Sequence, residues 1–171
     1  MMESWPQKTR LRHSIELAFN GLILIACLAV ISATAYNYVS ARKSSVTAIP
    51  RGTKIEIPGI DWRNSRHSVV LALSTKCHFC TASADFYRRL LDVAERRSVP
   101  VVFVFPQPKD EIASYLRNLD IPFSLLKQMP LENLHVTVTP TVFIVNSDGE
   151  ITDSWTGQLP AKLEQEVTAK L

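Results

Sequence analysis

Residues 68–80 read S-V-V-L-A-L-S-T-K-C-H-F-C, an apolar run that leads into two cysteines spaced as C-x-x-C. A short, continuous apolar run of this kind is typical of a β-strand buried on both faces. In residues 81–97, apolar side chains recur at helical spacing among charged ones, which predicts an amphipathic helix. The sequence therefore puts Cys77 and Cys80 where a buried strand ends and a helix begins.

This position favours thiol chemistry at Cys77. The thiolate is the attacking form of cysteine, and the unpaired N–H groups and dipole at a helix start stabilise negative charge. Cys80, deeper in the helix, can then resolve a mixed disulfide formed at Cys77. His78, the only ionisable residue between the two, would stabilise the thiolate further when protonated, and Lys76 adds a second cation nearby. The motif indicates a thiol–disulfide oxidoreductase that requires no cofactor and no metal.

The remaining pattern predicts an α/β fold. The expected elements are a short leading strand at residues 55–62, a buried strand at 99–105, a helix at 110–118, a β-rich stretch at 136–146, a partner strand at 150–155 and a closing helix at 159–171. A strand–helix–strand unit followed by a hairpin and a helix predicts a sandwich built on a mixed sheet.

Pro140 interrupts the β-rich stretch, which reads V-T-V-T-P-T-V-F-I-V over residues 136–145. Proline is normally excluded from a central strand because it removes a hydrogen-bond donor from the ladder. A cis bond between Thr139 and Pro140 would bend the start of the strand. It would also turn the carbonyl and N–H of Thr139 toward a neighbouring loop.

The C-x-x-C corner, the later T-P-T-x-F-I segment and the turn D-G-E-I together resemble the thioredoxin superfamily. The closest likeness is to membrane-anchored, TlpA/ResA-type redoxin domains, and it covers roughly residues 55–171. It implies a thioredoxin-like three-layer sandwich with a mixed β-sheet, preceded by one N-terminal transmembrane helix. Residues 110–126 resemble the extra strand–helix element that such domains carry between the active-site helix and the cis-proline.

The resemblance also implies roles for individual residues. Cys77 corresponds to the exposed nucleophile and Cys80 to the resolving cysteine, which together would form the redox-active disulfide. Pro140 corresponds to the cis-proline that faces them, and Thr139 to the residue whose backbone pairs with an extended substrate segment. Phe79 lies inside the motif, where it either lines a partner groove or serves as simple hydrophobic cover.

Two positions depart from the family pattern. Most relatives have a tryptophan just before the first cysteine, where this chain has Lys76. Thioredoxins carry a buried carboxylate six residues before that cysteine, where this chain has Leu71. Proton handling then depends on water or on another residue, and the candidate carboxylates are Glu56, Asp61 and Asp85.

The N-terminal region predicts a membrane anchor. Residues 17–38 are almost wholly apolar, with no charge between Glu16 and Arg42, and about 20 helical residues cross a hydrocarbon core. We expect a cytoplasmic segment at residues 1–16, a transmembrane anchor or uncleaved signal at 17–39, a stalk at 40–54 and a thioredoxin-like domain at 55–171. The domain would be extracytoplasmic, on the periplasmic side in a bacterium.

Three other readings of this leader remain open. Ala33-Thr34-Ala35 is an A-x-A sequence after which a signal peptidase could cut. Leu24-Ile25-Ala26-Cys27 resembles a lipobox, which would leave an acylated Cys27. A buried helix of a soluble protein is the third reading. Cleavage and acylation would both leave the domain on the same side as the anchor does.

Composition argues against several functional classes. From residue 40 onward, 16 Lys and Arg face 14 Asp and Glu, and no basic stripe stands out, so a nucleic-acid partner is not expected. A zinc site would need a second ligand pair, yet the chain has no second C-x-x-C, and His67 and His135 lie far apart.

We therefore expect an enzyme that exchanges disulfides with cysteines of exported proteins and receives electrons from an upstream membrane or soluble thiol partner. The resemblance favours a reductant, whereas His78 and Lys76 would favour an oxidant by stabilising the reduced thiolate; the expectation is a reductant. The alternatives are a non-catalytic thioredoxin-like binding module, a metal- or copper-handling domain that uses the C-x-x-C, a structural pair of buried thiols, and a peroxidase.

Overall fold

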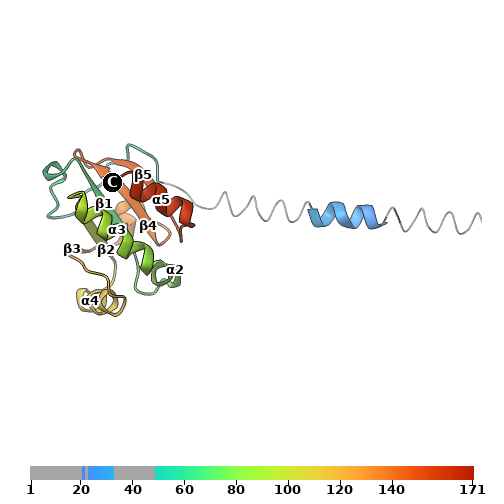
Figure 1. The fold of residues 1–171 in the computed structure, drawn as a ribbon, viewed down its shortest axis with the longest axis horizontal. Helices are drawn as coiled ribbons and strands as arrows, with labels where there is room; N and C mark the ends of the chain where they lie inside the picture. Colours follow the sequence, from blue (N-terminus) through green and yellow to red (C-terminus); the bar gives the residue numbers. More distant parts are fainter. Residues whose placement is uncertain (1–20, 22, 33–48) are drawn as a thin grey trace, which may run out of the picture. The chain divides into compact units, whose positions relative to one another are not determined.

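The computed structural model describes residues 21, 23–32 and 49–171. The chain divides into two compact units, Met1–Ser45 and Val46–Leu171. In the first unit residues 23–32 are helical (Figure 1). Within the described residues, no helix has both the length and the apolar character to cross a membrane. The predicted segment 1–16, the flanks of the span 17–39, Ala35 and most of the stalk 40–54 lie outside the described residues, so these assignments stay predictions.

The second unit contains five strands, four α-helices and two 3₁₀ helices in the part of the chain that the structure describes (Figure 1). In chain order they are η1 (Trp62–Asn64), β1 (His67–Ala72), α2 (His78–Ala82), α3 (Ala84–Arg96), β2 (Val101–Phe105), α4 (Lys109–Asn118), β3 (Leu125–Gln128), η2 (Leu131–Leu134), β4 (Thr141–Asn146), β5 (Ile151–Thr156) and α5 (Ala161–Ala169).

The five strands form one mixed sheet in the order β3-β2-β1-β4-β5. β1 lies at the centre, parallel to β2 and antiparallel to β4, so that Leu71 pairs with Phe103 on one side and with Val142 on the other. A parallel pair needs a crossover connection, which α2 and α3 provide between β1 and β2. β1 is buried from Ser68 onward, as its continuous apolar run predicts. The α/β class and the mixed sheet are confirmed.

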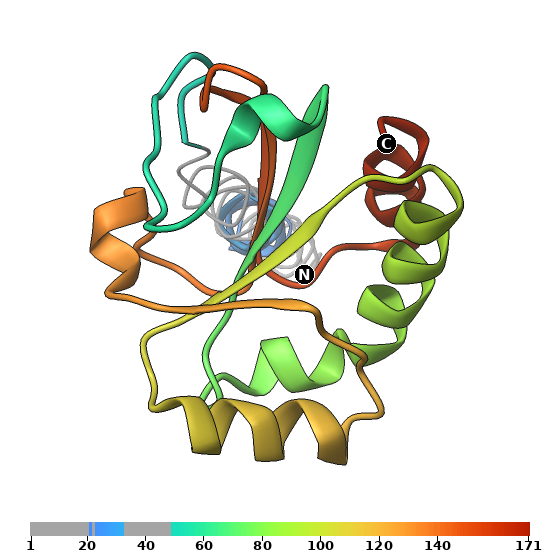
Figure 2. The ribbon, with the colours of Figure 1, turned by 90° about the vertical axis from the view of Figure 1, so that its left-hand side faces the viewer.

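Different layers cover the two faces of the sheet. On one face, α3 and α5 lie side by side (Figure 2), and side chains of α3, α4 and α5 join Val69, Leu71 and Leu73 in one core cluster. On the other face, Val70 and Ala72 pack against η2 and against Ile55 and Ile57. The second covering layer of the predicted sandwich is therefore a 3₁₀ helix and irregular chain rather than α-helices.

Two predicted boundaries shift for local reasons. The predicted helix 81–97 is two helices, α2 and α3, and it begins earlier, at His78. Ser83 separates them with φ −94° and ψ 8°, although its N–H still bonds to the Phe79 carbonyl at 3.1 Å. The β-rich stretch 136–146 becomes a strand only at Thr141, because Pro140 has no N–H to give to a ladder.

The leading strand expected at residues 55–62 is wrong. Lys54 makes an isolated bridge with Glu150, and the chain then turns at Pro58 and Gly59, whose φ is +73°. Positive φ suits glycine and breaks an extended strand. The structure also contains an edge strand, β3, that the sequence indicated only as part of the 110–126 element.

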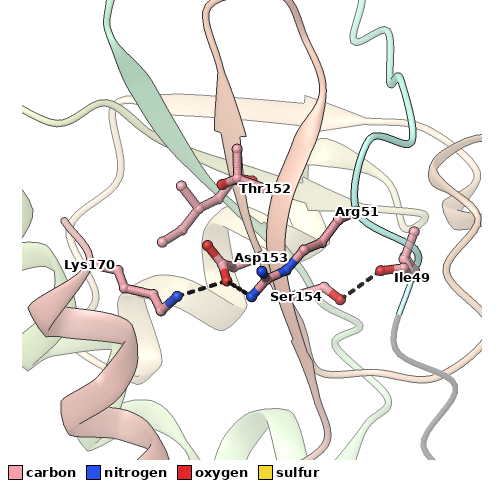
Figure 3. Close-up of polar contacts among 7 residues, drawn as sticks. Ile49, Arg51, Thr152, Asp153, Ser154 and Lys170 are labelled. Carbon is pink, nitrogen blue, oxygen red and sulfur yellow. Dashed lines mark hydrogen bonds and ion pairs between the residues drawn. The ribbon is translucent and has the colours of Figure 1, made fainter.

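The outer edge of β5 is covered by residues 49–55. Gly52 N–H donates to the Ile151 carbonyl at 2.8 Å, and Ile151 N–H donates to the Thr53 carbonyl at 2.9 Å. Figure 3 shows the side chains that fix this contact. Asp153 Oδ1 accepts hydrogen bonds from Arg51 at 2.6 Å and from Lys170, the C-cap residue of α5, at 2.8 Å. Asp153 thus holds the incoming chain and the last helix against the same strand.

Candidate active site

Cys77 lies at the N-cap of α2, five residues after Ala72 ends the central strand, where the sequence predicts it. Its Sγ accepts a hydrogen bond from the Cys80 N–H at 3.3 Å. Its own N–H donates to the Ser74 carbonyl at 3.2 Å, which closes the turn between strand and helix. The sulfur therefore faces the unpaired donors of a helix start, and the residue is half-buried rather than sealed.

The segment before β4 meets this sulfur from the other side. Cys77 Sγ–H donates to the Thr139 carbonyl at 3.3 Å, across 62 residues of chain. The peptide bond between Thr139 and Pro140 is cis, and Pro140 itself is buried. The structure thus brings together the two motifs that the sequence singled out.

The two thiols have opposite acid–base settings. Burial is the largest single influence on Cys77 and opposes its ionisation. Hydrogen bonds from the side chains of Thr139 and Cys80 and from the backbone of Cys80 and Phe79 outweigh it, so the pKa of Cys77 is lowered. Burial raises the pKa of Cys80 to about 12, and that residue is fully buried. Both cysteines are free thiols in this structure and lie close together.

His78 and Phe79 open helix α2, and both are exposed. Their rings make an edge contact, with centroids 5.8 Å apart. Phe79 is 55% exposed beside the Cys77 sulfur. In the described chain no hydrogen bond or ion pair joins His78 or the Lys76 ammonium to that sulfur, so their effect on the thiolate stays a prediction.

Residues 137–139 have unpaired backbone N–H groups and lie next to the Cys77 nucleophile. In the described part of the chain none of their three N–H groups has a hydrogen-bond acceptor. Val138, between them, is 46% exposed. A pocket of about 320 Å³ adjoins this segment. Its lining residues are Pro106, Leu131, Glu132, Val136, Thr137 and Thr139. An open row of donors beside a pocket suits an extended peptide.

Sequence reasoning missed Gln107, which fixes the loop that carries the nucleophile. Gln107 Nε2–H donates to Ser74 Oγ at 2.8 Å, and the Thr75 N–H donates to Gln107 Oε1 at 3.3 Å. The Thr75 hydroxyl also donates to Glu111 on α4. Nothing in the sequence signals these contacts, because the residues are 33 positions apart and meet only through the pairing of β1 with β2.

None of the three carboxylates considered for proton handling reaches the thiols. Glu56, Asp61 and Asp85 are all exposed; Asp61 pairs with Arg63 and Asp85 with Arg88. No Asp, Glu, Lys, Arg or His of the described chain is buried. These candidates are therefore not supported.

The histidines considered as metal ligands do not join the cysteine pair. His67 Nε2 lies 2.8 Å from the Leu171 carbonyl, and His135 is exposed at the end of η2. Among residues 21, 23–32 and 49–171, no group of three or more His, Cys, Asp or Glu side chains is arranged to hold a metal ion.

In this mixed sheet, the central strand leads to a C-x-x-C at a helix start, and a proline that directly precedes β4 lies opposite it. This arrangement defines a thioredoxin-like fold. The chain is similar to the thioredoxin domain of a thiol-disulfide oxidoreductase from Bacteroides vulgatus, with TM-score 0.56, 12% identity, and coverage of 71% of this chain and 97% of that one. It is also similar to StoA from Bacillus subtilis, with TM-score 0.52, 16% identity, and coverage of 72% and 95%.

A third similar structure is a thiol:disulfide interchange protein of the thioredoxin family from Chlorobium tepidum, with TM-score 0.53, 14% identity, and coverage of 72% and 97%. No protein-family model matches the chain, and no curated protein matches it by sequence. At these identities the likeness establishes the fold.

Proposed function

We propose that this chain is a thiol–disulfide oxidoreductase that exchanges disulfides with exported proteins, with Cys77 as nucleophile and Cys80 as resolving thiol. One observation carries the proposal: at a single helix start, the half-buried Cys77 sulfur accepts a hydrogen bond from the Cys80 N–H, while Cys80 itself is fully buried. The pKa of Cys77 is lowered accordingly, and burial raises the pKa of Cys80 to about 12. Two-step exchange requires an accessible, easily ionised thiol beside a second thiol that stays protonated until it resolves the mixed disulfide. The names of the structurally similar proteins support the same chemistry.

The reaction has two balanced steps. The Cys77 thiolate attacks one sulfur of a substrate disulfide, and the other substrate sulfur leaves as a thiolate that takes up a proton. Cys80 then loses its proton and attacks Cys77 Sγ, which breaks the mixed disulfide and releases the second substrate thiol. The substrate gains two electrons, and a Cys77–Cys80 disulfide remains for an upstream membrane or soluble thiol partner to reduce.

The substrate segment binds in extended form along residues 137–139, whose three N–H groups have no acceptor in the described chain. Pairing with Thr139 would align a substrate cysteine with Cys77, because the Thr139 carbonyl lies 3.3 Å from that sulfur. Pro140 forms the floor of this site, and Phe79 supplies exposed apolar surface at its rim. The substrates are thus proteins or peptides with accessible cysteines.

The proposed direction is reduction of the substrate. A strongly stabilised thiolate makes a dithiol an oxidant. In the described part of the chain, however, only uncharged groups hydrogen-bond to the Cys77 sulfur, and burial opposes their effect on its pKa. No charged contact therefore adds to the stabilisation of the reduced state in that part of the chain. Equilibration with glutathione should give a potential near that of thioredoxin, about −270 mV, and a value near −120 mV would reverse the proposed direction.

The proposal places the domain outside the cytoplasm, held by residues 17–39. The support is the apolar run of residues 17–38, which contains no charged side chain. The full chain should then resist carbonate extraction from membranes, and a membrane-impermeant thiol reagent should label Cys77 in intact cells. Labelling only after lysis would contradict this location.

The exchange itself is tested with the chain described here, in detergent and carrying Cys27→Ser, which removes the exposed leader cysteine. Reduced protein with a disulfide-linked peptide should release peptide thiols. Cys77→Ser should abolish release, whereas Cys80→Ser should accumulate a mixed disulfide at Cys77 that mass spectrometry detects. Undiminished exchange by Cys77→Ser would overturn the proposal.

A further inference from the structure

Tyr87 on α3 carries a buried hydroxyl that the exchange reaction, as described so far, does not use. The residue is 1% exposed, and its Oη has no hydrogen-bond partner among the residues that the structure describes. Leaving a buried hydroxyl unpaired costs free energy, and such groups are uncommon in folded proteins. An orphaned donor of this kind in the core needs an explanation.

The hydroxyl shares its surroundings with the resolving thiol. Tyr87 and Cys80 belong to the same buried cluster, and Cys80 contributes to raising the pKa of Tyr87, after burial as the largest cause. The hydroxyl of Ser83, which also affects that pKa, donates its own hydrogen to the Phe79 carbonyl at 2.8 Å. Because burial raises the pKa of Tyr87, the hydroxyl keeps its proton and is available as a donor.

Resolution of the mixed disulfide creates a charge in this apolar region. Cys80 is fully buried, and burial raises its pKa to about 12, so its thiolate is costly to form. Leu71 of β1 is fully buried too, and no charged residue or histidine of the described chain is buried. A neutral donor oriented in advance toward a developing charge lowers the free energy of the transition state.

The geometry points to Tyr87 as the hydrogen-bond donor that stabilises the Cys80 thiolate while it attacks the Cys77 sulfur. The inference rests on the proposed exchange function and adds a residue to its second step. Tyr87 keeps its proton throughout. The proton of Cys80 goes to the departing substrate thiolate, directly or through water, so the step needs no co-reactant beyond the substrate disulfide.

The test compares Tyr87→Phe with Tyr115→Phe in the full chain carrying Cys27→Ser. Tyr115 is the matched control because its hydroxyl already has a partner, Thr81 Oγ1, at 3.1 Å. Reduced protein is mixed with a peptide disulfide and quenched with acid at successive times, and mass spectrometry follows the mixed disulfide. This separates its formation at Cys77 from its resolution by Cys80.

Tyr87→Phe should form the mixed disulfide at the normal rate and resolve it about 10-fold more slowly, which corresponds to about 1.4 kcal/mol. Its resolution rate should also rise at a higher pH than in the unmodified chain, whereas Tyr115→Phe should change neither property. The stability of Tyr87→Phe should be unchanged or slightly higher, because the substitution removes an unpaired buried hydroxyl. If the Tyr87 hydroxyl had only a structural role, stability would be the same but the kinetics of resolution would not change.

Normal resolution and a normal pH profile in Tyr87→Phe would overturn the role of Tyr87 and leave the exchange function intact. Failure of the chain with both tyrosines to release any peptide thiols would instead overturn the exchange function, and this role with it.

Discussion

The edge of β5 and the corner at Cys77 differ in whether their backbone groups are hydrogen-bonded. At the start of β5, Gly52 and Thr53 pair with Ile151, and Asp153 accepts hydrogen bonds from two cations (Figure 3). At the corner, residues 137–139 keep three unpaired N–H groups beside a thiol with a lowered pKa. Covering an edge prevents unwanted strand pairing. The covered edge is therefore protected from such pairing, whereas the open corner keeps the backbone donors that the proposed peptide binding requires.

The largest effect that we expect is a difference in reactivity between Cys77 and Cys80, the two thiols of the corner. The pKa of Cys77 is lowered and that of Cys80 is about 12, whereas an ordinary thiol has a pKa of about 8.5. Near neutral pH, Cys77 should therefore carry more than about 1000-fold more thiolate than Cys80, since each pKa unit is a factor of ten.

Iodoacetamide alkylation of Cys77→Ser and Cys80→Ser, each combined with Cys27→Ser, measures this gap. The rate at Cys77 should rise with pH with a midpoint below that of an ordinary thiol, because the pKa of Cys77 is lowered. The rate at Cys80 should still be rising at the highest pH that the fold tolerates. Comparable alkylation rates at Cys77 and Cys80 would contradict the claim that the corner favours ionisation of Cys77.

The corner and the covered edge also differ in how far sequence predicts them. The apolar run 68–74 and the helical spacing after Cys80 specify the central strand and the active-site helix, because those signals are local. Pro140 opposite Cys77 was expected from a family resemblance. The unpaired hydroxyl of Tyr87 could not be predicted, because a tyrosine in an amphipathic helix finds or lacks a partner only once the core is packed.

The covered edge was missed for a different reason. Residues 49–55 attach to β5 largely through backbone hydrogen bonds, which almost any sequence can make, so no alternation of apolar and polar residues marks them. The side-chain clamp joins Arg51 and Asp153 across 102 positions and Lys170 and Asp153 across 17. Such contacts depend on tertiary arrangement rather than on local pattern.

Breaking the clamp should lower stability without altering the chemistry. Asp153→Ala removes the acceptor of two charged hydrogen bonds at a carboxylate that is 16% exposed. We expect the free energy of unfolding to fall by about 1–2 kcal/mol. The loss is limited because Arg51 and Lys170 are exposed to solvent, at least in part. Urea titration of the full chain measures the change.

Asp148→Ala is the matched control, because Asp148 is exposed and its side chain makes no hydrogen bond or ion pair in the described chain. It should leave the urea midpoint nearly unchanged. The alkylation rate of Cys77 should be the same in both variants. If Asp153→Ala slowed that alkylation while the protein stayed folded, the two regions would be coupled, and the division between a structural edge and a reactive corner would fail.

The smallest effect is expected from trimming the apolar rim of the open corner. Three large apolar side chains of the second unit are exposed in the described structure, namely Phe79, Val138 and Leu125. The first two flank Cys77 and Thr139, whereas Leu125 lies on edge strand β3, two strands away from β1. Phe79 is 55% exposed, and full burial of such a side chain contributes about 1.5–3 kcal/mol.

Partial burial against a peptide should therefore contribute about 1 kcal/mol, so Phe79→Ala should raise the KM for a peptide disulfide about fivefold. Val138→Ala should act in the same direction with a smaller change, and Leu125→Ala should leave KM unchanged. The maximal rate and the alkylation of Cys77 should stay constant in all three, because the sulfur and its donors are untouched. Equal effects from Leu125 and Phe79 would mean that apolar exposure on this domain is not specific to the corner, and the row of N–H groups at residues 137–139 would then have to select the peptide without an apolar rim.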